Sequence, residues 1–210
     1  MMLRRLFVAL ALVLAAGAGS EAGILMDGEL QGQVVKAELG RDPSRVLVTV
    51  GGTRRLVDLG RGEVYLLDGP RPKRMSARLP DDREPILPYD LRQWSSGPPV
   101  AGHISFYNVL QVQGRVCGEV LASRWMGEFV QPIVRAVEIV QRIDPRVSPK
   151  RREGCGAIPF AAFALNGWPL MAGWKDDTTF LTKGIHFDYP PPESLLTPPT
   201  DFEECGRGGC

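Results

Sequence analysis

Short runs of alternating apolar and polar residues, or of β-branched residues, dominate the chain between residues 33 and 68. Four such runs follow one another, with turn residues between them: Gln33–Leu39, Arg45–Val50, Thr53–Asp58 and Glu63–Asp68. A period of two predicts β-strands whose side chains face the two sides of a sheet in turn. Gly51-Gly52 predicts a two-residue hairpin turn, because both of its central positions require a positive φ angle. The connections are too short for crossover helices, so we expect an antiparallel meander.

The next segment, residues 80–102, is rich in proline and charged residues and has no apolar periodicity. This composition predicts a long connection or a flap over the sheet, which is a common place for a lid. Ile104–Gln113 predicts a further strand, and Arg115–Val120 is expected to continue it after Gly114.

A helical pattern is strongest over Ala122–Ile143, where apolar residues recur at intervals of three and four and therefore share one face. These residues are Trp125, Phe129, Ile133, Ala136, Val137, Val140 and Ile143. Pro132 interrupts the pattern, so we expect one kinked helix or two short helices. The face either packs on the sheet as core or lines a ligand site.

The rest of the chain again predicts strands, at Phe160–Ala164, Pro169–Trp174 and Thr178–Asp188, with a tight turn at Asn166-Gly167 between the first two. The fold class is therefore predicted as α+β: an antiparallel β meander or incomplete barrel covered by one kinked helix or two short helices. Residues 23–199 are expected to form a single domain, and residues 200–210 a flexible tail.

The amino terminus has the order of a secretory signal peptide. Arg4 and Arg5 precede an apolar run from Leu6 to Ala16, and small residues follow it. Signal peptidase requires small side chains before the cut, which Ala16-Gly17-Ala18 and Ser20-Glu21-Ala22 both provide, and we favour a cut after Ala22. The alternative is a retained anchor, but the apolar run is shorter than the roughly 20 residues that span a membrane. We expect residues 1–22 to be removed and the mature chain, which then has no membrane span, to be periplasmic.

Charge argues against nucleic acid as a partner. The whole chain carries a net charge of +1, and removal of residues 1–22 brings this to zero. Two local basic runs remain, around Arg74 and around Arg151, but no aromatic residues interleave them for base stacking.

Four cysteines suit an oxidising compartment. Cys117 and Cys155 flank the predicted helix, and a bridge between them would tie it to the following strand. Cys205 and Cys210 enclose a glycine-rich stretch that is flexible enough to close a small ring. A metal site is the alternative, but neither His103 nor His186 stands at ligand spacing from the thiols.

No motif for catalysis or for a cofactor is present, and we expect neither. His103 and His186 are the two imidazoles, and an enzyme would need an acid within hydrogen-bond reach of one of them. The adjacent carboxylates, such as Asp176 and Asp177, point to opposite faces of a strand or form turns, so they do not act as an acid–base pair.

The strands that contain Arg54-Arg55-Leu56-Val57-Asp58 and Glu63-Val64-Tyr65-Leu66-Leu67-Asp68 resemble the opening hairpins of periplasmic lipoprotein carriers of the LolA and LolB type. The segments Asn166-Gly167-Trp168-Pro169-Leu170, Thr179–Phe187 and Leu195–Pro199 with Phe202 look like their closing strands. The resemblance covers about two thirds of the mature chain. It implies an incomplete barrel, closed by helices, with an apolar concave face that holds acyl chains. The cysteines depart from the family, and no family-type arginine aligns, so the resemblance does not extend to lipoprotein transport.

Two functions follow. The first is an exported domain that binds an apolar or lipid-like ligand in a half-barrel pocket. From the periodicity of apolar residues, we expect the pocket to be lined by Leu66, Phe106, Trp125, Phe129, Phe180 and Phe187. The alternative is a protein-interaction or structural domain of the cell envelope whose apolar stripe is all core. An apolar ligand and an envelope protein are thus the two expected partners.

Overall fold

A computed structural model describes residues 23–76, 89–126, 130–147, 155, 160–174 and 179–205. Its main feature is one 12-stranded sheet with the strand order β12-β6-β5-β4-β3-β2-β1-β11-β10-β9-β8-β7. The strands are β1 (Gly23–Leu30), β2 (Gln33–Leu39), β3 (Arg45–Val50), β4 (Thr53–Asp58), β5 (Glu63–Leu66), β6 (Lys73–Ser76), β7 (Tyr89–Ser96), β8 (Phe106–Val112), β9 (Arg115–Ser123), β10 (Trp168–Trp174), β11 (Thr179–Tyr189) and β12 (Glu203–Glu204). Every pairing is antiparallel except that of β12 with β6.

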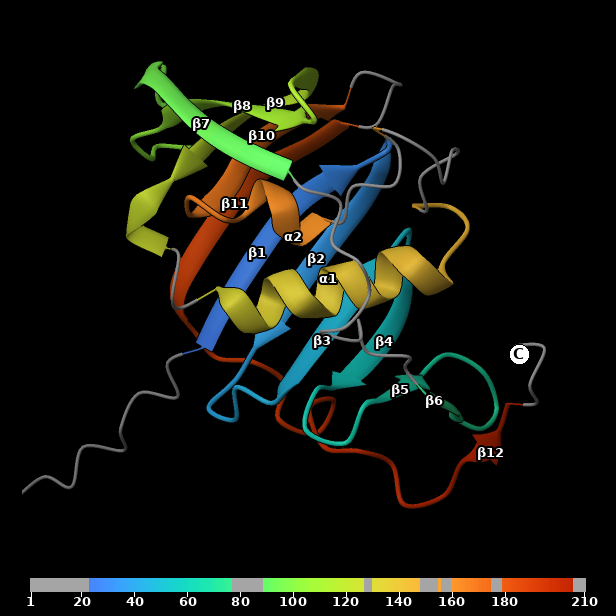
Figure 1. The fold of residues 1–210 in the computed structure, drawn as a ribbon. Helices are drawn as coiled ribbons and strands as arrows, with labels where there is room; N and C mark the ends of the chain where they lie inside the picture. Colours follow the sequence, from blue (N-terminus) through green and yellow to red (C-terminus); the bar gives the residue numbers. More distant parts are fainter. Residues whose placement is uncertain are drawn as a thin grey trace, which may run out of the picture.

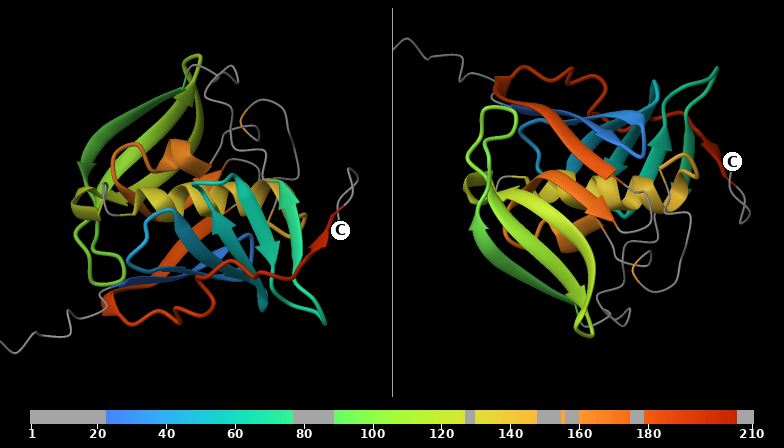
Figure 2. Two further views of the ribbon diagram at one scale, coloured as in Figure 1. Left: turned by 90° about the horizontal axis from the view of Figure 1, so that it is seen from below. Right: turned by 90° about the horizontal axis from the view of Figure 1, so that it is seen from above.

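The helices lie within the curve of this sheet. Helix α1 (Gln131–Ile143) crosses one face and contacts β2, β3 and β4, and the short helix α2 (Phe160–Phe163) lies beside it (Figure 1). Figure 2 shows that the sheet wraps partly around α1, while the C-terminal segment runs along the opposite, outer face. The predicted α+β class, an incomplete antiparallel barrel with helical cover, is confirmed.

The core fills the space between the sheet and the helices. The inward side chains of the strands and the apolar face of α1 form one cluster, which includes Val35, Ala37 and Val48 from the sheet and Ile133, Val137 and Val140 from α1. Each of these side chains is almost completely removed from water. Because burial of each large aliphatic side chain contributes about 1.5–3 kcal/mol, this layer is the main source of stability.

The predicted meander is confirmed. The runs 33–39, 45–50 and 53–58 are β2, β3 and β4, while the fourth ends at Leu66 rather than Asp68. Gly51 and Gly52 have φ angles of 52° and 83°, as the hairpin turn between β3 and β4 requires.

The structure corrects the sequence prediction at five strands. In each case the local pattern of residues does not contain the tertiary contacts that define the strand. Residues 89–96 within the predicted loop 80–102 form β7, an exposed strand that shows no apolar alternation. Arg115–Val120 does not continue the preceding strand but returns as β9 through a turn at Gln113-Gly114, where both φ angles are positive. Strands β1 and β6 were not predicted at all. Residues 203–204 of the predicted tail form β12.

The predicted helix from Ala122 is also corrected. Ala122 and Ser123 end β9, a 3-10 turn spans Arg124–Met126, and α1 begins only at Gln131. Pro132 therefore stands in the first turn of α1, where the missing N–H costs no hydrogen bond, and does not kink it.

The predicted strand Phe160–Ala164 is helix α2 instead. Buried Glu138 of α1 accepts a hydrogen bond from the Ala161 N–H at 3.3 Å and from Arg142 at 2.9 Å. A carboxylate at this position satisfies an N–H that the helix itself leaves unpaired. The turn at Asn166-Gly167 thus joins a helix to β10 rather than two strands.

One predicted disulfide is confirmed. Cys117 of β9 is bonded to Cys155, with 5.1 Å between their Cα atoms. Cys205 is also disulfide-bonded, while Cys210, its predicted partner, lies outside the described residues. Within the described part of the chain, no helix is long and apolar enough to cross a membrane. The predicted signal peptide, residues 1–22, falls outside that part.

Candidate functional site

Phe180, one of the six predicted pocket residues, is part of the packed core. Its ring is fully buried and makes edge-to-face contacts with Phe160 at 5.0 Å and Trp168 at 5.8 Å between ring centroids. The Trp168 Nε1–H donates a hydrogen bond of 2.8 Å to Thr182 Oγ1, so the indole is satisfied within the protein. Phe180 was expected to line a pocket, but the three rings of this cluster pack against one another instead.

The other predicted pocket residues do not join Phe180. Leu66 is on β5, which β4, β3, β2 and β1 separate from β11. Phe187 pairs with Ile24 at the opposite end of β11 from Phe180 and is half exposed. Phe106 and Trp125 lie at the open end of the β8–β9 hairpin, away from its turn at Gln113-Gly114. Phe129 falls outside the described residues. The described members therefore do not line one cavity.

The interior also holds a buried ion pair. Arg55 on β4 donates to Asp144 at the end of α1 over 2.7 Å, and Arg146 donates to the same carboxylate. Burial alone would raise the pKa of Asp144, but the hydrogen bonds from Arg146 and the charges of Arg55 and Arg146 outweigh it and lower the pKa. Burial lowers the pKa of Arg55. The cluster fastens α1 to the sheet.

The two histidines lie on different elements, and neither is buried. His186 is exposed on β11, with its Nε2 atom 3.6 Å from Asp27 Oδ2. His103 forms an isolated bridge with Val100 in the turn before β8. Among the described residues, no group of three or more His, Cys, Asp or Glu side chains stands close enough to hold a metal ion.

Large apolar side chains are exposed at one end of the β7–β8–β9 region. Trp94 is 66% exposed, Ile104 65% and Trp125 80%. Trp94 stands at the irregularity between Gln93 and Ser95 on β7, Ile104 lies just before β8, and Trp125 follows the end of β9. The register pairs Ser96 with Phe106 and Phe106 with Ala122, so all three apolar residues lie at the same end of these strands.

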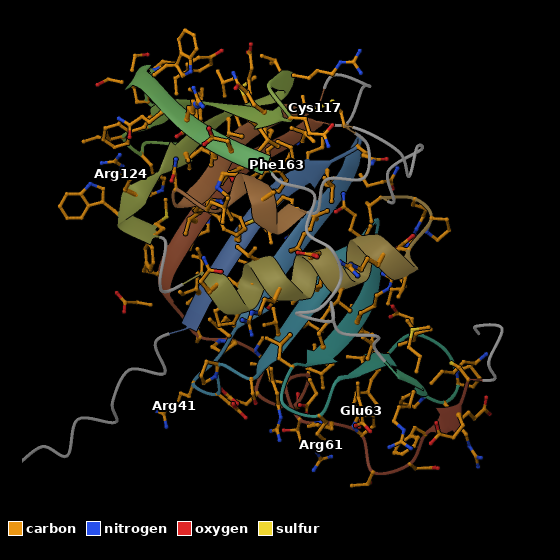
Figure 3. The ribbon with its side chains drawn as sticks, viewed as in Figure 1. Arg41, Arg61, Glu63, Cys117, Arg124 and Phe163 are labelled. Carbon is orange, nitrogen blue, oxygen red and sulfur yellow. A yellow bond between two sulfur atoms is a disulfide. The ribbon has the colours of Figure 1, made fainter. Side chains whose placement is uncertain are left out.

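Arg124 contacts both β7 and β8 at this end. Its guanidinium lies 4.9 Å from the centre of the Phe106 ring and donates a hydrogen bond to Gln93, the neighbour of Trp94. Figure 3 shows Arg124 at this outer end of the sheet. We call the surface formed by Trp94, Ile104, Trp125 and Arg124 the aromatic end patch. Tryptophan and arginine are among the residues that dominate protein interfaces energetically.

The patch adjoins a terminal strand of the sheet. β7 pairs with β8 on one side and is the last strand in the order, and residues 92–96 are all exposed. Such an edge presents backbone N–H and C=O groups to which another extended chain can bond. Sequence reasoning named Trp125 for a pocket and placed Trp94 in the flap, but it missed Ile104 as a site residue. A large apolar residue between polar neighbours is a sequence signal for an exposed apolar side chain, and Trp94 between Gln93 and Ser95 is an example.

No protein-family model matches the sequence, and no curated protein matches it. Several solved structures are similar to this chain at low identity. An uncharacterised conserved protein from Thermus thermophilus is 11% identical, with a TM-score of 0.45 over 88% of this chain and 90% of that one. MucB is 12% identical, with a TM-score of 0.32 over 86% of this chain and 58% of its own. The same values of identity and TM-score hold for the complex of Pseudomonas aeruginosa MucA and MucB, over 86% of this chain and 56% of that one.

PNGF-II is a further similar structure, with 10% identity and a TM-score of 0.38 over 89% of this chain. This chain spans only 31% of the PNGF-II chain. At such low identities and TM-scores, these likenesses do not assign a function. Membership of the LolA and LolB type stays a prediction.

Proposed function

We propose that the protein is an exported, non-enzymatic domain of the cell envelope that binds another protein through the aromatic end patch. The exposure of Trp94, Ile104 and Trp125 at one end of the sheet carries this proposal. Exposed aromatic side chains cost free energy in water and recover it when a partner covers them. Arg124 adds a positive charge next to Trp125 and beside Gln93, the neighbour of Trp94.

The packing of the interior supports a surface site over a pocket site. Phe180, Phe160 and Trp168 occupy the space beneath the sheet and contact one another. In a lipid carrier, such side chains would instead be arranged around a cavity. The aromatic residues of the patch stay uncovered and lie outside.

Export is supported by two independent features. Residues 1–22 have the charged, apolar and small-residue order of a signal peptide. The disulfide between Cys117 and Cys155 is of the kind that persists outside the reducing cytoplasm. The periplasm is therefore the compartment that we propose.

Site-specific photocrosslinking in the native host tests the proposal. A photoreactive residue in place of Trp125 is expected to capture one envelope protein, and the same residue in place of Val34 on β2 serves as the control. Val34 is also exposed, at 54%, but lies on another strand of the sheet. With the captured partner purified, W94A and W125A are each expected to weaken binding by about 30-fold, the effect of losing roughly 2 kcal/mol at an interface hot spot. Equal capture at both positions, or unchanged affinity in both variants, would contradict it.

The lipid-carrier alternative is tested on the same preparation. Native mass spectrometry of the protein purified from the periplasm, followed by organic extraction, is expected to show the mass of the bare chain. A released acyl-chain compound in stoichiometric amount would contradict our proposal and restore the half-barrel pocket as the site.

A further inference from the structure

The segment after β11, residues 190–205, packs on the outer face of the sheet, away from α1 (Figure 2). We call it the C-terminal strap. It begins with Pro190-Pro191-Pro192 and ends after β12. Together with outward-facing side chains of the sheet it forms a second apolar cluster, separate from the main core, made of Leu47, Leu56, Tyr65, Leu67, Leu195, Leu196 and Phe202.

The sheet is shaped to receive the strap. Leu196 is buried, and its Cδ1 atom would lie only 2.6 Å from a Cβ atom at Gly40. Any side chain at residue 40 would therefore collide with Leu196, so the glycine leaves the space that this leucine fills. The contact is close and specific rather than a loose covering of the sheet.

Phe202 is held between two side chains of the sheet. Its ring makes an edge-to-face contact with Tyr65 at 5.7 Å, and the Arg74 guanidinium stands 4.4 Å from the ring centre. Arg74 also donates to Glu63 at 2.9 Å and to Glu204 of the strap. One arginine thus contacts both the aromatic ring and a carboxylate two residues further along the strap.

Backbone hydrogen bonds complete the contact. β12 pairs in parallel with β6, and the N–H groups of Glu203 and Cys205 donate to the carbonyl oxygens of Pro72 and Arg74, both at 2.9 Å. Addition of an extended chain to a sheet edge, with pockets for alternate side chains, is a common way of binding peptides. The strap is bound by this means to its own chain.

We propose that Tyr65, Arg74 and the edge of β6 form a peptide-binding site that the C-terminal strap occupies in the free protein. The site takes an extended peptide that carries an aromatic residue followed two residues later by a carboxylate. The strap shows which chemistry fits: the ring lies between Tyr65 and Arg74, and the carboxylate meets the arginine.

The strap's pairing with the sheet edge is short. β12 has only two residues, and the ion pair between Arg71 and Asp201 is 3.9 Å long with both side chains mostly exposed. Exposed ion pairs of this kind contribute little, about 0–1 kcal/mol. The prolines at residues 190–192 favour an extended chain, which does not fold back into the sheet by itself.

A synthetic peptide with the sequence of residues 199–204, Pro-Thr-Asp-Phe-Glu-Glu, tests the site in trans. Fluorescence anisotropy with the labelled peptide is measured on the full chain and on its F202A variant. Because F202A weakens the competing strap, it is expected to bind the peptide about ten-fold more tightly than the wild type. A peptide with alanine in place of phenylalanine is the control and is expected not to bind.

Two further variants keep the result clear. E204Q removes the one strap carboxylate that bonds Arg74 and is expected to raise peptide affinity about three-fold, so it decides the question if F202A fails to fold. Adding R74Q to F202A is expected to abolish binding. Equal affinity of F202A, E204Q and the wild type, or equal binding of the control peptide, would overturn the proposal.

This site is independent of the aromatic end patch. Arg124 and Glu63, which mark the two surfaces, lie on opposite sides of the molecule (Figure 3). The W94A and W125A variants are therefore expected to bind the peptide as the wild type does, and failure of one proposal leaves the other standing.

Discussion

The buried pair of Arg55 and Asp144 allows a sharp test of how α1 is held on the sheet. The side chains are 8% and 1% exposed, and 2.7 Å separates the bonded atoms. Replacing Asp144 by Asn keeps the shape and still accepts the hydrogen bond from the Arg146 N–H. It leaves the Arg55 charge buried without its partner, which costs about 3–5 kcal/mol in such settings. Arg55 retains its 3.2 Å bond to the Thr53 carbonyl, so we expect D144N to lose about 3 kcal/mol of unfolding free energy.

Urea unfolding followed by circular dichroism measures this loss, with the disulfides kept intact. The matched control is D90N, which breaks the ion pair between Asp90 and Arg92 on the exposed strand β7. Because that pair is solvated, the control is expected to lose less than about 1 kcal/mol. In the double variant R55M/D144N the unpaired charge is gone, so its loss is expected to be smaller than the sum of the single losses. A D144N loss no larger than that of D90N would refute the reasoning.

The same variant makes a prediction about pH. The pKa of Asp144 is lower in the folded protein than its ordinary value. A depressed carboxyl pKa gives stability that is fully present above the unfolded pKa, about 3.9, and is lost as the pH falls through the folded pKa. The stability gap between the wild type and D144N is therefore expected to be constant near pH 7 and to narrow below about pH 4. A gap that stays the same down to about pH 2.5 would show that the charge of Asp144 is not its source.

Two further predictions concern the disulfide and the aromatic cluster. The bridge between Cys117 and Cys155 closes a loop with a sequence separation of 38, so C117A/C155A is expected to lose about 4 kcal/mol of unfolding free energy by the chain-entropy relation; a loss below about 1 kcal/mol in urea unfolding would contradict this. F180A is expected to cost about 3–5 kcal/mol, as truncation of a packed core ring does, and F187A less than about 1 kcal/mol. Similar losses for both variants would contradict the placement of Phe180 in the core and Phe187 on the surface.

The meander could be predicted from sequence because its information is local. β2 alternates with a period of two, β3 is a short run rich in β-branched residues, and the hairpin turn between β3 and β4 consists of two glycines. Each strand pairs with its neighbour in the chain, as in the register of Val35 with Val50. No distant contact is needed to set these boundaries.

The strands that escaped prediction depend on distant or exposed partners. β1 pairs with β2 across the turn at Gln31-Gly32 and, on its other side, with the distant β11, where Gly23 meets Tyr189. β7 is exposed over residues 92–96, and of its described side chains Leu91 is the one that packs against the core. β12 has two residues and exists only because β6 and the side chains beneath the strap hold it. None of these conditions leaves a periodic pattern in a short window.

The candidate site shows the same division. Trp125 and Phe180 were assigned together to one pocket because each fits an apolar periodicity. The structure separates them, since the chain leaves β9 at Ser123 and α1 begins only at Gln131, which puts Trp125 outside the core. Whether an apolar side chain is buried depends on which surfaces cover it, and a pattern along the chain does not state this.

By itself, then, the sequence determined the α+β class and the central hairpins, because these follow from period and turn chemistry. Only the tertiary structure decided which aromatic residues stay exposed, and that the strap covers the outer face of the sheet. These features result from contacts between segments far apart in the chain, such as Phe202 with Tyr65, whose free energy exists only once the sheet has formed.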